Sequence, residues 1–255
     1  MKKTKIIIPA LGMLLLSTAA SVTGTVAWFS MNSDVTASSM SVTAVAESGI
    51  AIAPYKTNNT VAPLDAEFKN IAPACVAAKT QMRPTFTDNG VNWYHAKSVD
   101  VNNGQSLSTE GYEDVSSATD IYLLNKFQIK STADTTDVYV KGITLQASGG
   151  QEFDACARVL IKSGDATLFF APISPATHTS ETTGTGGAIS TAKTINFTTV
   201  NTQAALVLDD LTTTAEDVDV YLYFDGEDVA CKSINIYSFV ATTVDVVFTS
   251  IAPQA

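Results

Sequence analysis

The feature that most constrains the fold is a two-residue hydrophobic period that returns along most of the chain. Successive side chains of a strand point to opposite faces, so this period predicts strands with one buried face. The clearest case has one apolar face and one polar or aromatic face: Val218, Val220, Leu222 and Phe224 against Asp217, Asp219, Tyr221 and Tyr223. Further strands are predicted over 40–46, 93–101, 122–130, 137–147, 154–162, 166–173, 194–199, 234–240 and 244–248.

Turn-forming residues separate these runs, and helical periodicity is scarce. Asp88-Asn89-Gly90 and Asp225-Gly226 are typical turn sequences. Only 203–211 favours a short helix, while 104–120 and 174–193 are polar, aperiodic and expected to be long surface loops. Many strands without alternating helices predict an all-β fold, a single jelly-roll-like β-sandwich.

The N-terminus has the pattern of an export signal. Lys2, Lys3 and Lys5 precede an uncharged apolar run, and Thr25-Val26-Ala27 satisfies the small-x-Ala rule for signal peptidase. A cut after Ala20 also fits, and residues 6–29 are long enough for a permanent membrane anchor. We expect cleavage between Ala27 and Trp28, because the strongly apolar stretch is short. The signal peptide is then 1–27, and the domain 28–255 is secreted or at the cell surface, without permanent membrane insertion.

Charge and motif content exclude several functions. The net charge of −10 argues against nucleic-acid binding, which depends on Lys and Arg. His95 and His178 stand apart and form no H-E-x-x-H zinc motif, and neither a G-x-S-x-G elbow nor a phosphate-binding glycine loop is present. We therefore expect no catalytic residues and no enzyme activity.

One carboxylate-rich turn is a candidate metal site. Asp225, Glu227 and Asp228 follow the strand that ends at Phe224. Calcium takes six to eight oxygen ligands, and such a turn can supply several of them. The spacing is not that of an EF-hand, and Asp-Gly is also a favoured hairpin turn. A plain turn is the favoured interpretation, with calcium as the alternative and no other cofactor expected.

Three cysteines offer disulfide partners: Cys75, Cys156 and Cys231. An odd number in an exported chain allows one disulfide and a free thiol, or three free thiols. Their spacing includes no C-x-x-C pair, so neither a zinc site nor a redox centre is indicated.

The junction after the signal resembles a known family. Residues 24–42, which read Gly-Thr-Val-Ala-Trp-Phe-Ser-Met-Asn-Ser-Asp-Val-Thr-Ala-Ser-Ser-Met-Ser-Val, look like the start of the TasA/camelysin group. These exported proteins are processed by the SipW type of signal peptidase. The segment from Tyr223 to Cys231, Tyr-Phe-Asp-Gly-Glu-Asp-Val-Ala-Cys, is similar to a second family segment. The resemblance implies a jelly-roll sandwich and a biofilm-matrix fibre subunit; the camelysin protease label finds no zinc motif here.

The mature N-terminus is a candidate donor strand. Residues 28–46 begin with an aromatic pair, contain β-branched residues and then alternate; the candidates are Trp28, Phe29, Val35, Met40, Val42 and Ala44. Such a segment can complete the sheet of a neighbouring copy, or pair within its own subunit. Two functions follow: a subunit that polymerises with copies of itself, or a monomeric module that binds glycan or envelope components through loop aromatics such as Tyr112 and Tyr237.

Overall fold

The computed structural model describes residues 35–36, 41–77, 81–96, 112–148, 157–172, 192–199, 206–226 and 240–252. These ranges contain fifteen strands and one turn of 3-10 helix, η1 (Asp65–Glu67), so the predicted all-β class is confirmed. No helix among them is long and apolar enough to cross a membrane. The strands are β1 (Val35–Thr36), β2 (Ser41–Glu47), β3 (Ile50–Pro54), β4 (Ile71–Ala72), β5 (Gln81–Met82), β6 (Tyr94–Ala96), β7 (Tyr112–Asp114), β8 (Leu123–Ser131), β9 (Thr136–Ser148), β10 (Ala157–Ser163), β11 (Ala166–Pro172), β12 (Ala192–Thr199), β13 (Leu206–Leu211), β14 (Glu216–Phe224) and β15 (Val240–Thr249).

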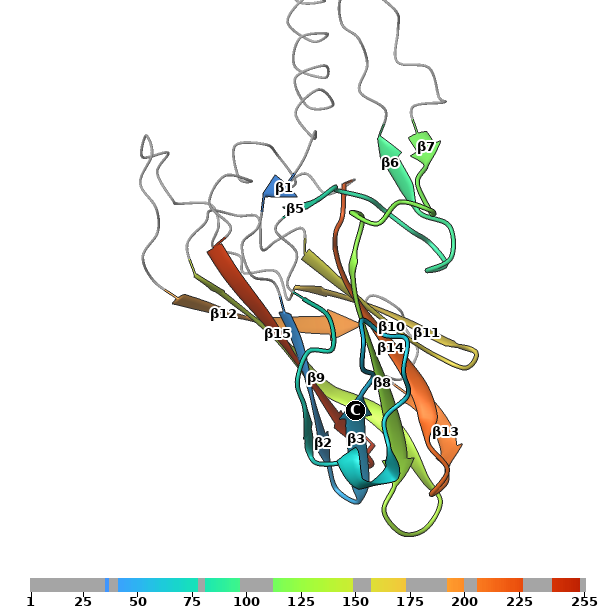
Figure 1. The fold of residues 1–255 in the computed structure, drawn as a ribbon. Helices are drawn as coiled ribbons and strands as arrows, with labels where there is room; N and C mark the ends of the chain where they lie inside the picture. Colours follow the sequence, from blue (N-terminus) through green and yellow to red (C-terminus); the bar gives the residue numbers. More distant parts are fainter. Residues whose placement is uncertain are drawn as a thin grey trace, which may run out of the picture.

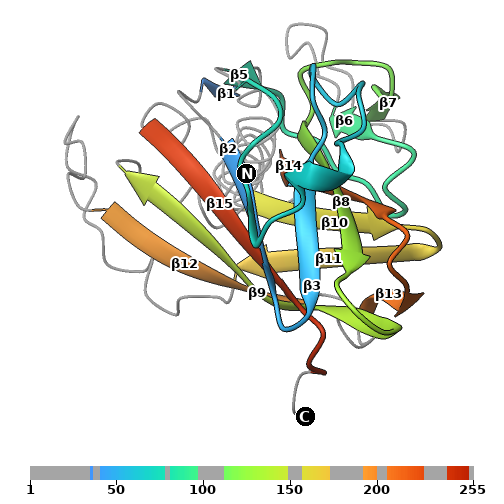
Figure 2. The same cartoon turned by 60° about the horizontal axis from the view of Figure 1, so that its bottom comes forward.

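Two layers of strands pack against each other (Figures 1 and 2). The first layer has the order β3-β8-β14-β10-β11, with antiparallel neighbours throughout. The second has the order β9-β15-β2-β4, and β13 lies beside the first half of β9. Here β15 and β2 run parallel, whereas the other neighbours are antiparallel. The layers make a β-sandwich, as predicted from the sequence; the jelly-roll connectivity stays a prediction.

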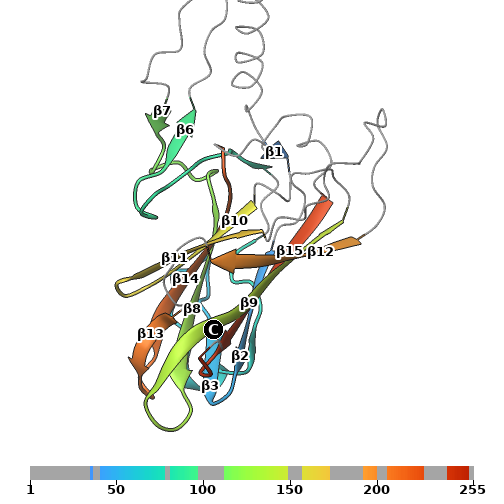
Figure 3. The same ribbon diagram turned by 180° about the vertical axis from the view of Figure 1, so that it is seen from behind.

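The two layers are joined along both sides. On one side β12 pairs with β9 through 192–196 and with β11 through 197–199, so a single strand crosses between layers (Figure 3). On the other side, Lys69 pairs with Ile52 of β3 and Ile71 pairs with Val45 of β2. These connections pair much of the backbone that an open sandwich would leave at its edges.

Alternating side chains of both layers form the main core. In β8, for example, buried and half-buried residues alternate over the whole strand. The largest of the fully buried side chains include Phe127, Phe224 and Phe248, which come from β8, β14 and β15. The period-two pattern therefore located the core faces correctly.

A second, smaller core lies on the outer face of the first layer. Residues 81–96 and 112–122, here called the cover, fold back onto β10 and β14. Trp93 of the cover is buried between Tyr122 and Tyr223, with ring centroids 4.8 Å and 5.0 Å away. Leu160 of β10 is fully buried in the same cluster. Tyr223, predicted on the polar face of its strand, is therefore buried by the cover.

Two sequence predictions need correction. The helix expected over 203–211 is wrong, because Leu206–Leu211 forms strand β13 and pairs with β9. A short apolar run fits either element, and pairing with β9 decides it. Part of the loop expected over 104–120 is also ordered, because β7 pairs with β6 and Val115 is buried. Strand β3 was not predicted from the sequence. Of the strands predicted over 93–101 and 234–240, the described part of the chain contains 94–96 and Val240 as strand residues.

Candidate functional site

The first long strand, β2, is the feature most relevant to assembly. It lies between β15 and β4, and all seven of its residues pair in parallel register with β15. Val42, Ala44 and Ala46 point into the main core and are almost fully buried. On the outer face, Thr43 donates a hydrogen bond to the Asp245 carboxylate and Lys141 Nζ lies 2.6 Å from Glu47 Oε2. The site that holds β2 is thus built by residues much later in the chain.

A two-residue corner connects β2 to the rest of the sandwich. Ser48 and Gly49 carry the chain from the second layer to β3 in the first, with φ angles of 56° and 82°. Both angles lie in the left-handed region, which costs a non-glycine residue such as Ser48 about 1 kcal/mol or more. Short connections with this kind of strain favour exchange of the preceding segment between copies of a protein.

The predicted donor residues fall on both sides of the described boundary. Val42 and Ala44 lie in β2 and pair within their own subunit in this single chain. Val35 lies in β1, where it pairs with Met82 of β5. Ala27, Trp28, Phe29 and Met40 lie outside the described residues. Pairing within the subunit, one of the two alternatives from the sequence, is therefore seen for residues 41–46.

Only one of the three candidate calcium ligands at the acidic turn lies in the described part of the chain. Asp225 Oδ2 lies 3.3 Å from Arg158 Nε, and the residue also forms a parallel bridge with Thr85 of the cover. Glu227 and Asp228 lie outside the described residues. The Arg158 guanidinium competes with any cation for the Asp225 carboxylate, which favours the plain turn. Calcium binding here stays a hypothesis.

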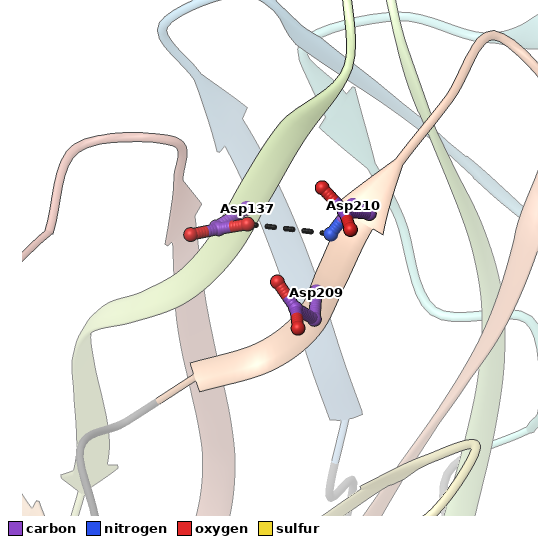
Figure 4. A group of neighbouring side chains, drawn as sticks. All are labelled: Asp137, Asp209 and Asp210. Atoms are coloured by element: carbon purple, nitrogen blue, oxygen red, sulfur yellow. Dashed lines mark hydrogen bonds between the residues drawn. The ribbon is translucent and has the colours of Figure 1, made fainter.

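A different acidic group, which the sequence did not reveal, is present at the edge of the second layer (Figure 4). Carboxylate oxygens of Asp137 in β9 and of Asp209 and Asp210 in β13 lie within 4.8 Å of one another. The Asp210 N–H donates to Asp137 Oδ1 at 3.3 Å, and Tyr139 Oη donates to Asp137 Oδ2 at 3.0 Å. The adjacent pair Asp209-Asp210 is visible in the sequence, but its meeting with Asp137 depends on the β9–β13 register.

The charges of this acidic group and the irregular pairing around it are typical of a sheet edge that does not pair with other chains. Hydrogen bonds from the Asp210 N–H and from Tyr139 lower the pKa of Asp137. The hydrogen bond between Asp209 and Asp137, together with repulsion from Asp210, raises the pKa of Asp209. The β9–β13 pairing is irregular, and Asp210 has a φ of 53°. Charges and bulges of this kind keep an edge strand from pairing with other chains.

Polar side chains form a network on the outer face of the first layer. Asp217 Oδ1 accepts hydrogen bonds from Tyr55 Oη at 2.7 Å and from Gln128 Nε2 at 2.9 Å. The pKa of Tyr55 is raised to about 12, mainly by burial and next by the hydrogen bond to Asp217. Burial also raises the pKa of Asp219, although Lys126 lies 3.6 Å away. This network holds the residues after β3 against β8 and β14.

The cysteines are only partly described. Cys75 is a half-buried free thiol, and its Sγ donates to Asn59 Oδ1 at 2.7 Å. Burial raises the pKa of this thiol, which makes it a poor nucleophile near neutral pH. Cys156 and Cys231 lie outside the described residues. The pairing of the cysteines therefore stays open, apart from the free state of Cys75.

The remaining candidates add little chemistry. His95 Nδ1 lies 2.6 Å from the Pro84 carbonyl oxygen, within the cover. Tyr112 lies in β7, whereas Tyr237 and His178 are outside the described residues. Compared with protein-family models, curated proteins and solved structures, the chain matches none of them. The TasA/camelysin resemblance therefore rests on the residues at the signal junction and around 223–231 alone.

Proposed function

We propose that this chain is a secreted structural subunit that assembles head to tail into extracellular fibres by exchanging its N-terminal strand. The observation that carries the proposal is the placement of β2. It is the first long strand, it fills a slot between β15 and β4, and only Ser48 and Gly49 tie it to β3. The strand can leave its slot without disturbing the order of the other strands in the first layer.

Exchange between copies reuses contacts that already exist. When β2 of one copy fills the slot of the next, the Val42, Ala44 and Ala46 side chains are buried as before. Opening the corner also relieves the left-handed conformation at Ser48. Each subunit then donates at one place and accepts at another, so the contact is heterologous and can continue into an open filament. Calcium, glycan and envelope components have no part in this mechanism.

The acidic residues at the edge of the second layer support end-to-end growth of the fibre over sideways association. Asp209 and Asp210 on the irregular strand β13 disfavour sideways pairing of sheets. Fibre growth then depends on the exchanged N-terminal strand and not on sideways pairing of sheets.

Microscopy of the mature protein tests the proposal. We expect purified residues 28–255 to form filaments in negative stain as the concentration rises, and to show a concentration-dependent lag. A lengthened Ser48–Gly49 connection, with four Gly or Ser residues inserted, lets β2 fold back without strain, so filaments should become fewer. Mature protein that stays monomeric at high concentration would instead favour the secreted glycan- or envelope-binding module.

A further inference from the structure

The edge of β8 beyond the end of β3 is held in an unusual way. β3 pairs with β8 only as far as Pro54, opposite Phe127, and the last backbone bond runs from Tyr55 N to Lys126 O. Beyond that point, the side-chain amide of Asn59 takes the place of a strand. Its Nδ2 donates to Leu124 O at 2.9 Å, and Lys126 N donates to its Oδ1 at 2.9 Å.

These two bonds reproduce strand pairing with a side chain. In a parallel ladder, one residue donates its N–H to a carbonyl and accepts from an N–H two residues further along the neighbour. The Asn59 amide makes this pair of bonds around Asn125. The Leu124 carbonyl and the Lys126 N–H are therefore competent to bind a strand, and the Asn59 side chain occupies both. The Lys126 carbonyl is taken by Tyr55 N and, at 3.4 Å, by Cys75 Sγ.

The turn that presents Asn59 is strained. Thr57, Asn58 and Asn59 are consecutive left-handed residues, with φ angles of 49°, 52° and 67°. Asparagine tolerates this conformation, whereas a β-branched threonine is a true outlier there. Hydrogen bonds from Thr60 N to Lys56 O at 3.0 Å and from Thr60 Oγ1 to Thr57 O at 2.6 Å hold the turn in place.

A buried group behind the turn is incompletely satisfied. Asn125 is fully buried, and its Oδ1 accepts from Cys75 N at 2.9 Å. Its Nδ2 has no hydrogen-bond partner among the described residues. An unpaired buried amide destabilises the folded state, so the contacts of Asn59 and Cys75 leave part of this edge unsatisfied.

We propose that the turn Thr57–Asn59 is a plug in a strand-acceptor site at 124–126 of β8, and that the occupant which displaces it is the N-terminal segment 28–40 of a second copy. The inference rests on the proposed function for the identity of the occupant. Within one chain, Val35 and Thr36 of that segment pair with Met82 and Gln81 of β5. The plug blocks this edge of β8 in the free subunit. The N-terminal segment of a neighbouring copy displaces the plug when the two copies assemble.

β5, the partner of β1, lies close to the start of β8. β1 pairs with β5, and the next residue, Arg83, donates its N–H to Asp120 O at 2.7 Å. Asp120 lies three residues before the start of β8. A segment that a second copy places at β5 is thus at the end of the sheet where β8 begins.

Peptide binding to the plug variants tests the proposal. The probe is a synthetic peptide of residues 28–40, titrated into monomeric mature protein below the filament threshold. Asn59→Ala removes both plug bonds and should tighten peptide binding about tenfold. Thr57→Gly relieves the strain, stabilises the plug and should weaken binding about fivefold. Asn58→Asp is the matched control, because Asn58 is exposed in the same turn and aspartate also tolerates its left-handed conformation, with a φ of 52°, so the affinity should be unchanged.

Hydrogen exchange at Lys126 identifies the place of binding. The Lys126 N–H should lose protection in Asn59→Ala and regain it when the peptide is added. Thermal melting of each variant confirms that it is folded. Equal affinities in all three variants, or no renewed protection at Lys126, would overturn the plug. That outcome leaves the proposed filament formation through β2 untouched. If the affinities change as expected but the mature protein forms no filaments, the proposed function is overturned and the plug stands.

Discussion

Replacement of Gly90 by alanine should detach the cover and cost the protein about 3 kcal/mol of unfolding free energy. Gly90 has a φ of 64°, and a Cβ there would lie 2.7 Å from Leu160 Cδ2 and 3.1 Å from Lys162 Cδ. Leu160 is fully buried and has little room to move. The backbone strain and the clash act together, so Trp93 should become exposed before the sandwich unfolds. Denaturant unfolding, followed by tryptophan fluorescence and by far-UV circular dichroism, measures both steps.

Gly164→Ala is the matched control for this effect. Gly164 has a φ of 52° in the β10–β11 hairpin, but a Cβ there meets no atom within 4 Å. Alanine at 164 should therefore cost only the backbone strain, about 1 kcal/mol. Equal losses of stability at the two glycines would show that the cover does not press on Leu160.

Removal of residues 28–46 should abolish filaments and destabilise the subunit by about 3 kcal/mol. The structure explains this cost, because the deletion takes Val42, Ala44 and Ala46 out of the core and leaves β15 without its parallel partner. The deletion also leaves β4 and β5 without their strand partners, but the longer strands of both layers stay paired, so a β-rich fold should remain. Circular dichroism, melting temperature and negative-stain microscopy give the three readouts.

Adding the missing segment as a peptide should reverse the loss of stability. A ligand that binds only the folded state, present at 100 times its Kd, stabilises by about 2.7 kcal/mol. The control peptide carries Val42→Asp, which would bury a charge in the slot and should have no effect. If the truncated protein still polymerises, or if its melting temperature does not change when the peptide is added, β2 is not the exchanged element.

Local pattern was enough to predict the class of fold and most long strands. Alternation identified β14 and β8 because each has one face in the core. The alternation pattern missed β3, because all of its residues except Pro54 are buried one after another. It also placed a helix where β13 lies, because an apolar run of that length has no period of its own.

The candidate sites depended on register, which no local pattern contains. Asp137 meets Asp209 and Asp210 only through the β9–β13 pairing. The local sequence offered only Asp225, Glu227 and Asp228 as a candidate cluster, with a plain turn as the favoured interpretation there. The pairing of the Asn59 amide with β8 is likewise not visible in the local sequence. The slot for β2 was also hidden, since its parallel partner β15 lies about 200 residues further along the chain.

Crosslinking between β2 and β15 tests the central claim most directly. Ser41 and Thr243 are register partners, with Oγ and Oγ1 3.4 Å apart, so cysteines at these positions can form a disulfide. Ser41→Cys and Thr243→Cys are placed on separate chains in which the three native cysteines are serine. The two proteins are mixed, assembled and oxidised. Strand exchange predicts covalent dimers, and a protein carrying both cysteines should give a ladder of multimers on a non-reducing gel. Filaments that yield only monomers with an internal disulfide would contradict the account.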